Sequence, residues 1–314
     1  MILCSPSPLP DEVRHVITRW TETQNSRLFT FIHAKEDLDR TMVDRVCKER
    51  KHYAGIETLD VLIDSGGGDI EAAYQLTTFL RRRCKKLRVF VPDWAKSAST
   101  LIALGADEIW MSDTAELGPL DAQIPDPRDP NEFISALEEF RAIDYLRNHG
   151  YEILDELAVL LLRRARLKIR DVLDHAIQYA TQIMAPLYSQ VDPLYFGGAH
   201  RALEMSIEYG KRVMSRYAYR GWSTKRIEGL LKELTWNYPS HTFVIDYIEV
   251  ERLGLEVRLL TGELEEWAHA IIGKCTECIG LLEADVSQKT PAPIEKQVSE
   301  ESDGQKEQVH PTQD

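Results

Sequence analysis

Short apolar runs and amphipathic segments alternate along the first third of the chain. Four apolar runs bounded by polar or turn residues predict buried strands, and they cover residues 28–32, 58–64, 87–91 and 108–111. The segments around them carry apolar residues at three- and four-residue steps, which predicts helices. These segments are residues 11–27, 36–51, 70–84 and 97–105. Strands separated by helices imply right-handed crossovers and a mainly parallel sheet, so the pattern predicts an α/β fold.

The pattern changes after residue 125, where three closely spaced prolines predict a turn-rich break. A helical period then runs through residues 131–220, with interruptions expected near 191–193 and 196–198. Two further helices are expected over 224–234 and 246–253. The second half of the chain is therefore predicted to be mainly helical.

Residues 283–314 differ in composition from the rest. They carry eight acidic residues against three lysines, three prolines and no aromatic residue, which is typical of a disordered tail. The whole chain has a formal net charge of −13. Such a charge disfavours non-specific binding to nucleic acid, so no nucleic-acid partner is expected.

The sequence shows no signal for a membrane anchor, a metal or a cofactor. Its apolar runs are too short to cross a bilayer, and the N-terminus lacks the features of a signal peptide, which predicts a cytoplasmic protein. Five scattered cysteines favour reduced thiols, and the pair Cys275 and Cys278 supplies only half the ligands of a zinc site. No P-loop, dinucleotide fingerprint or HExxH motif occurs.

Two turns that follow successive predicted strands carry the candidate chemistry. In the first, Gly66-Gly67-Gly68, glycine allows backbone N–H groups to face a cleft. In the second, Ser97 stands at the start of a helix, where developing negative charge is favoured. Together they predict a nucleophile facing an oxyanion hole. The alternative role for Ser97 is to cap the helix, and Ser99 and Thr100 are fallback nucleophiles.

These residues resemble the Clp-fold serine proteinases, and most closely their serine dehydrogenase proteinase branch. The likeness rests on the glycine turn, on Pro92-x-x-Ala95-x-Ser97 with the helix after it, and on residues 117–123. A weaker likeness at residues 238–241 and 253–255 extends it over roughly residues 20–260. The resemblance implies a ClpP/crotonase-like spiral of ββα units with a helical C-terminal extension. It also implies an oxyanion hole formed by Gly67, Gly68 and the Ala98 N–H.

The resemblance also suggests how the chain divides. We expect an N-terminal helical segment, a ClpP/crotonase-like catalytic core, a mainly helical extension that completes the domain, and the acidic tail. Their bounds are 1–26, 27–125, 126–282 and 283–314. Relatives usually assemble into homo-oligomers, and the helical stretch 153–162 carries more apolar residues than one buried face needs.

The general base is not fixed by the motifs. ClpP-like enzymes carry a histidine about 25 residues after the serine, where this chain has Asp121 and Ala122. Lys96 is a candidate because it adjoins Ser97, and the alternative for it is a solvated or salt-bridged lysine. His241 is a candidate because it matches a histidine of the family's later motif, and the alternative is a structural role. Asp121 is expected either to orient a base or to close the floor of the cleft.

The sequence therefore predicts a serine peptidase that cleaves a peptide or protein substrate through an acyl-enzyme on Ser97. Lys96 or His241 would transfer protons, with no metal and no cofactor. Two alternatives stay open. A crotonase-like enzyme acting on acyl thioesters would need a pocket for adenine and pyrophosphate. A catalytically idle Clp-fold scaffold would explain the missing histidine and lysine at the expected spacings.

Overall fold

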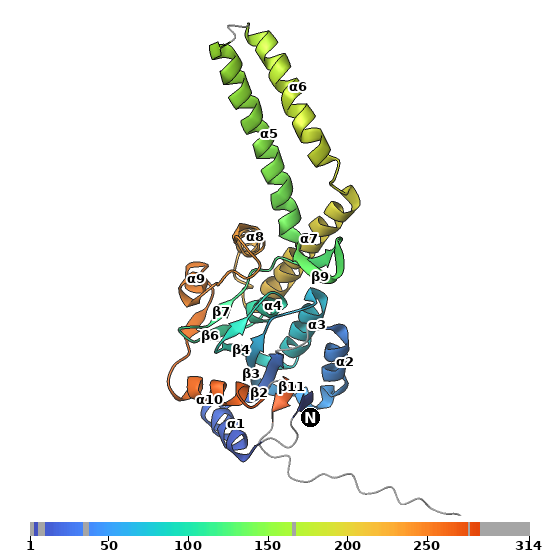
Figure 1. The fold of residues 1–314 in the computed structure, drawn as a ribbon. Coiled ribbons are helices and arrows are strands. Elements are labelled where there is room, and N and C mark those ends of the chain that lie inside the picture. The colour runs from blue at the N-terminus through green and yellow to red at the C-terminus, as the bar shows by residue number, and fades with distance from the viewer. Residues whose placement is uncertain (1–2, 6–9, 34–37, 165–167, 276, 283–314) are drawn as a thin grey trace, which may run out of the picture. The chain divides into compact units, whose positions relative to one another are not determined.

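A nine-stranded, mainly parallel sheet forms the centre of the computed structural model, which describes residues 3–5, 10–33, 38–164, 168–275 and 277–282 (Figure 1). The main row of the sheet has the order β1-β11-β2-β3-β4-β6-β10. These strands are Leu3–Ser5, Glu277–Leu282, Arg27–His33, Ile56–Ser65, Cys84–Val91, Glu108–Met111 and Val257–Leu259. From β2 to β10 neighbouring strands are parallel, whereas β1 and β11 are antiparallel. The predicted α/β class with a mainly parallel sheet is confirmed.

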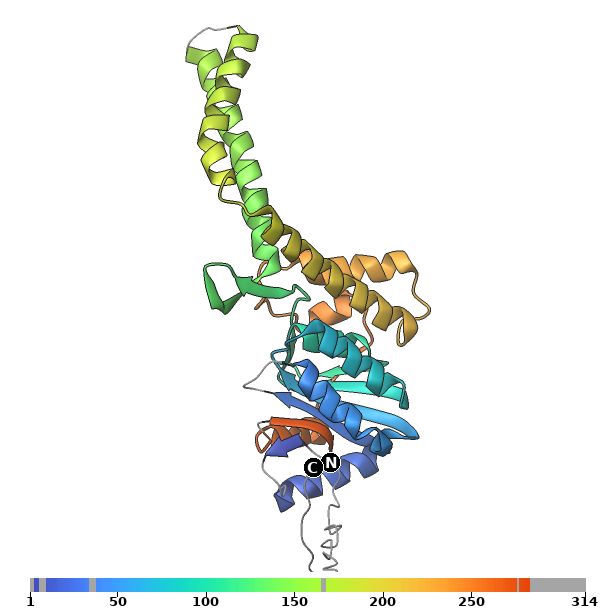
Figure 2. The same cartoon turned by 90° about the vertical axis from the view of Figure 1, so that its right-hand side faces the viewer.

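Alternate residues of the central strands enter two separate cores. Phe29 and Phe31 of β2 pack on one face of the sheet, and Leu28 and Ile32 pack on the other. Helices α2 (Arg40–Lys48), α3 (Ile70–Arg81) and α4 (Ala98–Leu104) cover the first face. Helices α1 (Asp11–Gln24) and α10 (Glu263–Ile272) cover the second (Figure 2). The strand residues are mostly apolar because both faces are buried, and Thr30, Asp60 and Arg88 are buried polar exceptions.

A short second row of strands branches from β3 and was not predicted. Strand β5 (Trp94–Ala95) pairs with the end of β3, where Ala95 lies opposite Ser65. Strand β7 (Glu116–Leu117) pairs with β5. An antiparallel bridge between Leu117 and Ile245 then attaches the loop before α9 to β7. This branch brings the turn at Ser97 and the loop after residue 238 to one end of the sheet.

The helical region begins after a β-hairpin. The expected turn at residues 125–130 is the tip of this hairpin, and residues up to 135 are strand rather than helix. The hairpin and the helices that follow are β8 (Gln123–Asp126), β9 (Asp129–Ser135), α5 (Ala136–Arg164), α6 (Ile169–Tyr188), α7 (Pro193–Arg216), α8 (Thr224–Lys232) and α9 (Tyr247–Arg252). Helices α5 and α6 run side by side in both views (Figures 1 and 2). The helical C-terminal region is confirmed.

One prediction for the helices was wrong. The interruption expected at residues 196–198 is absent from the described chain, because α7 starts at Pro193 under an Asp192 cap and continues through both glycines. Phe196 of α7 packs against Phe140 of α5 with the rings tilted and their centroids 4.4 Å apart, and this packing offsets the low helix propensity of glycine. Residues 233–237 form a short π-helical turn after α8.

The C-terminal part of the predicted extension, within 126–282, contributes strands to the sheet. Strand β10 pairs with β6, and β11 inserts between β1 and β2. The prediction of reduced thiols was wrong for Cys278, which is disulfide-bonded, whereas Cys47, Cys84 and Cys275 are free. The tail at 283–314 lies outside the described residues. Across the part of the chain that is described, no helix combines the length and apolarity that a membrane span requires.

Candidate active site

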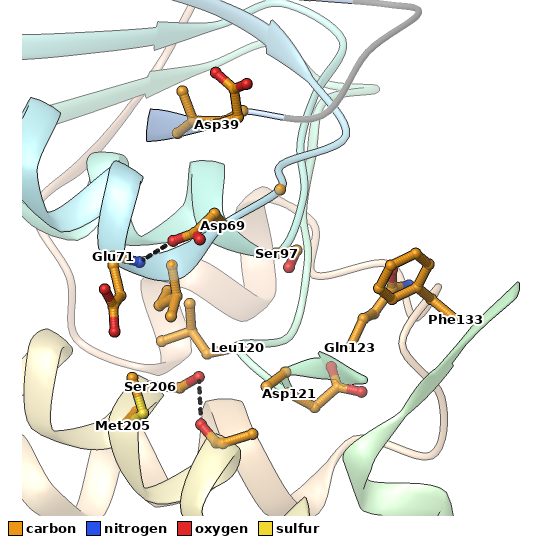
Figure 3. A pocket seen from close by; sticks show the side chains of 15 residues that line it. Asp39, Asp69, Glu71, Ser97, Leu120, Asp121, Gln123, Phe133, Met205 and Ser206 are labelled. Carbon is orange, nitrogen blue, oxygen red and sulfur yellow. Dashed lines mark hydrogen bonds between the residues drawn. The ribbon is translucent and has the colours of Figure 1, made fainter. Parts of the chain in front are cut away.

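A cavity of about 450 Å3 lies beside the turn that carries Ser97. Its wall is formed by the glycine turn after β3, the start of α3, residues 120–123 after β7, and one face of α7. Figure 3 shows Ser97 on one side of this space and Leu120 and Asp121 on another. The cavity therefore brings together Ser97, Gly68 and Asp121, three residues selected from the sequence.

The glycine turn allows β3 and the Ser97 turn to approach closely. Gly67 has φ of 110°, a conformation that glycine adopts without strain. A Cβ atom on Gly67 would lie 2.7 Å from the Lys96 carbonyl oxygen and 2.9 Å from the Ser97 Cβ. Gly68 has φ of 131°, and a Cβ atom there would lie even closer to the Leu38 backbone. Neither position has room for a side chain, so the turn is both conformationally and sterically restricted to glycine.

Ser97 is held in an unusual backbone conformation for a residue with a side chain. Its φ is 49° and its ψ is −121°, a combination that costs about 1–3 kcal/mol for a non-glycine residue. Ser97 occupies the N-cap position of α4, yet within the described residues its hydroxyl makes no capping hydrogen bond. The capping role considered from the sequence is therefore not the one that the geometry supports.

The hydrogen bonds around the turn explain how the strained conformation is maintained. The Lys96 N–H donates to the Ser65 carbonyl at 3.0 Å. The Thr100 hydroxyl lies within 2.9 Å of the carbonyl oxygens of both Ala95 and Gly118. Thr100 and Ser99 are fully buried in α4, so these fallback nucleophiles have structural positions.

Two backbone N–H groups next to Ser97 are suited to bind an oxyanion. Ala98 provides the first N–H of α4, which by helix geometry has no intrahelical acceptor. Its nitrogen lies 3.0 Å from the point where a Gly67 Cβ would stand. The Gly67 N–H donates to the Ser65 hydroxyl at 3.1 Å, whereas that of Gly68 has no acceptor among the described residues. Of the predicted donors, Gly68 and Ala98 remain available, and Gly67 acts as the spacer between them.

Asp121 joins the cavity to a histidine 120 positions later in the chain. Its Oδ1 lies 3.0 Å from the His241 Nδ1, and its Oδ2 accepts a hydrogen bond from the Ser135 hydroxyl. The Asp121 side chain is 1% exposed and that of His241 is 18% exposed. A carboxylate that accepts from Nδ1–H fixes the tautomer in which Nε2 carries the lone pair. Ser135 was not found from the sequence, although a serine just before a helix is a capping signal.

Lys96, the other candidate base, is engaged elsewhere. Its Nζ lies 2.9 Å from a carboxylate oxygen of Glu116. It also donates to the carbonyl oxygens of Leu117 and Phe243 at 3.5 and 3.3 Å. The salt-bridged role weighed for Lys96 from the sequence is the arrangement that the structure contains, and its partner Glu116 was not anticipated.

A buried carboxyl lies directly before the glycine turn. Asp64 ends the apolar part of β3 and is 8% exposed. Burial raises the pKa of the Asp64 carboxyl to about 6, and the nearby Asp93 carboxylate adds to the rise. Within the described residues, no cluster of three histidine, cysteine or carboxylate side chains is arranged to hold a metal ion.

The part of the chain that contains Ser97 matches a known protein family. Residues 9–142 match the family described as ClpP-like SDH-type serine proteinase, so the resemblance is confirmed over those residues. Two uncharacterized proteins of Methanocaldococcus jannaschii are similar, at 29% identity over 120 residues and 41% over 66 residues. These matches cover 35% and 21% of this chain, and 42% and 23% of the relatives. The chain thus spans less than half the length of the curated relatives it matches.

The following solved structure is one of seven matching chains. It is an enoyl-CoA hydratase/isomerase family protein from Silicibacter pomeroyi, 16% identical, covering 61% of this chain and 95% of its own, with a TM-score of 0.26. A similarity at that score supports no conclusion about fold or function. His241 and its loop lie beyond the residues that the proteinase family matches.

Proposed function

From the match of residues 9–142 to a serine proteinase family, we propose that this protein is a serine peptidase with Ser97 as its nucleophile. The observation that carries the proposal is the Ser97 turn. A serine with positive φ, a hydroxyl free of capping bonds and two adjacent N–H donors has the arrangement that acyl transfer needs. A structural serine would have no reason to occupy a strained position.

In this mechanism the Ser97 Oγ attacks the carbonyl carbon of a peptide bond. The carbonyl oxygen becomes an oxyanion and accepts hydrogen bonds from the N–H groups of Gly68 and Ala98. The dipole at the N-terminus of α4 further stabilises this oxyanion. The leaving amine departs with a proton and an acyl-enzyme remains on Ser97. Water then attacks the acyl carbon, and the same hole binds the second oxyanion.

We assign proton transfer to His241 rather than to Lys96. The bond from His241 Nδ1 to the buried Asp121 leaves Nε2 free to accept the serine proton, and Asp121 stabilises the imidazolium that forms. The Lys96 Nζ is bonded to the Glu116 carboxylate and to the carbonyl oxygens of Leu117 and Phe243, so we do not assign it the role of base. In this proposal Asp121 orients the base, which is one of the two roles expected for it.

A fluorophosphonate probe tests this function without knowledge of the substrate. We expect the probe to form a covalent adduct with Ser97, located by mass spectrometry, and no adduct with Ser97→Ala. An adduct elsewhere, or none, contradicts the proposal. Titration with coenzyme A in parallel separates the remaining alternatives. Binding of coenzyme A without labelling would favour the acyl-thioester enzyme. The absence of both labelling and binding would favour the idle scaffold.

We further propose that the protein forms a homo-oligomer through the α5–α6 hairpin. Apolar side chains on both helices are exposed, including Val159 at 46%, Ile169 at 63% and Ile177 at 52%. A two-helix hairpin cannot bury such residues on more than one face, and a second copy would cover them. Light scattering at micromolar concentration should give a multiple of the 36.0 kDa chain mass, and a monomer mass would contradict this proposal.

A further inference from the structure

Lys96 connects the two segments that the proposed reaction brings together. It adjoins Ser97 in the chain, and its Nζ donates to the carbonyl oxygen of Phe243, two residues after His241. Through Glu116 and the Leu117 carbonyl, the same ammonium is bound to β7. One cation therefore contacts the nucleophile turn, the strand beside it and the loop of the base.

The position of Lys96 is closely defined by its surroundings. The residue is 8% exposed. A Cβ atom on Gly118 would lie 2.8 Å from the Lys96 Cδ, so the lysine stem packs directly on the Gly118 backbone. The Leu117–Ile245 bridge attaches the far end of the His241 loop to the same strand. The ammonium adds a second attachment between His241 and that bridge.

We propose that Lys96 is a positioning residue that fixes the His241 loop against the Ser97 turn. The proposal rests on the function proposed above and goes beyond it. Proton transfer depends on the distance between base and nucleophile, and a displacement of about 1 Å can cost about 10²-fold in rate. The Glu116 carboxylate holds the ammonium in place, because a lysine side chain is otherwise free to rotate.

The decisive experiment is a double-mutant cycle between Lys96→Met and His241→Gln. The readout is the maximal rate of Ser97 modification by a fluorophosphonate probe, together with the probe concentration at half-maximal rate. We expect Lys96→Met alone to lower the maximal rate about 10- to 100-fold with little change in the half-maximal concentration. In the His241→Gln background, Lys96→Met should cause no further loss, since it acts through His241. A residue that only stabilises the fold would give equal losses in both backgrounds.

Two further variants keep the test interpretable. Lys86→Met removes another ion-paired lysine, bonded to Glu108 near the start of β4, and should leave the labelling rate unchanged. Glu116→Gln should lower the rate in the same direction as Lys96→Met, and it replaces Lys96→Met in the cycle if that variant does not fold. An unchanged rate in both folded Lys96→Met and Glu116→Gln overturns the positioning role.

The pH dependence separates this role from that of a base. If Lys96 positions His241, the Lys96→Met rate still rises with pH in the same way as the wild-type rate. If Lys96 is itself the base, that rise disappears in Lys96→Met and persists in His241→Gln, which overturns the inference. Failure of the peptidase function would be seen separately, as no labelling of the wild-type protein or as labelling that persists in Ser97→Ala.

Discussion

The nucleophile and the base of the candidate site are encoded in different ways. Ser97, Gly68 and Ala98 come from two turns of one βαβ region, separated by about 30 positions, within the residues that match the proteinase family. The base assembly combines Asp121, Ser135 and His241 from three elements, and His241 lies outside that match. A short stretch of chain thus defines the proposed oxyanion site, and tertiary packing adds the proposed base.

The two regions also differ in how much the backbone constrains them. The Ser97 turn depends on positive φ at Ser97 and Gly67 and on contacts too close for any Cβ. His241 sits in a loop and relies on one side-chain bond and on attachments to β7. We therefore expect substitutions in the turns to be poorly tolerated, and substitutions in the base loop to affect rate more than stability.

The largest expected effect is that of Ser97→Ala. Removal of the nucleophile should lower hydrolysis of fluorescein-labelled casein by at least about 10³-fold. The melting temperature should stay within about a degree of wild type, because the lost hydroxyl makes no capping bond in the described residues. Undiminished hydrolysis by a folded mutant would show that Ser97 is not the nucleophile.

The next largest effect is expected in the base assembly. His241→Gln should lower kcat about 10²- to 10⁴-fold with little change in KM, because general-base catalysis acts on the transition state. Asp121→Asn keeps the shape but removes the charge that orients Nδ1–H, so kcat should fall in the same direction. If both folded variants retained wild-type kcat, the base would have to come from another residue.

Within the glycine turn, Gly67→Ala and Gly66→Ala form a matched pair. An alanine at position 67 would be strained at φ of 110° and would collide with the Lys96 carbonyl. We expect the peptidase rate to fall about 10²-fold and the melting temperature to drop by about 4 °C or more. At Gly66 the nearest atom is 3.9 Å away, on Trp94, so Gly66→Ala should be tolerated. Equal effects at both positions would refute the close approach at Gly67.

A smaller effect is expected from Asp64, which lies directly before the glycine turn. The carboxyl has an ordinary pKa of 3.8 and a folded-state pKa of about 6, so the folded protein binds an extra proton between these values. The stabilisation that this proton gives the folded state is complete below about pH 4 and is lost as pH rises through about 6. Asp64→Asn should flatten the fall in melting temperature over that range. An identical pH dependence in mutant and wild type would contradict this assignment.

The sequence was sufficient for the features that local chemistry determines. Apolar runs predicted β2, β3, β4 and β6, and Asp69 is a local cap of α3, with its carboxylate accepting from the N–H groups of Glu71 and Ala72. The choice of Ser97 followed from its position after a strand and from the family motif. Each of these predictions depends only on residues that are close together in the sequence.

The remaining features depend on contacts between distant segments. Strands β5 and β7 have only two residues each, so no periodicity could reveal them. Strand β11 joins the sheet after the mainly helical region that begins at Ala136, and its partners β1 and β2 are at the other end of the sequence. The Asp121–His241 bond likewise spans 120 positions. Spacing alone could not distinguish His241 from Lys96, because only packing shows that Lys96 is paired with Glu116.

The central claim is that a locally encoded nucleophile is served by a base from a distant loop. The most direct test is the pH dependence of Ser97 modification by a fluorophosphonate probe in wild type and His241→Gln. We predict that the wild-type rate rises with pH, because a general base acts only when it is deprotonated, and that this rise is absent in the folded mutant. A mutant that reacts at Ser97 with the wild-type rate and the same pH profile would contradict the account.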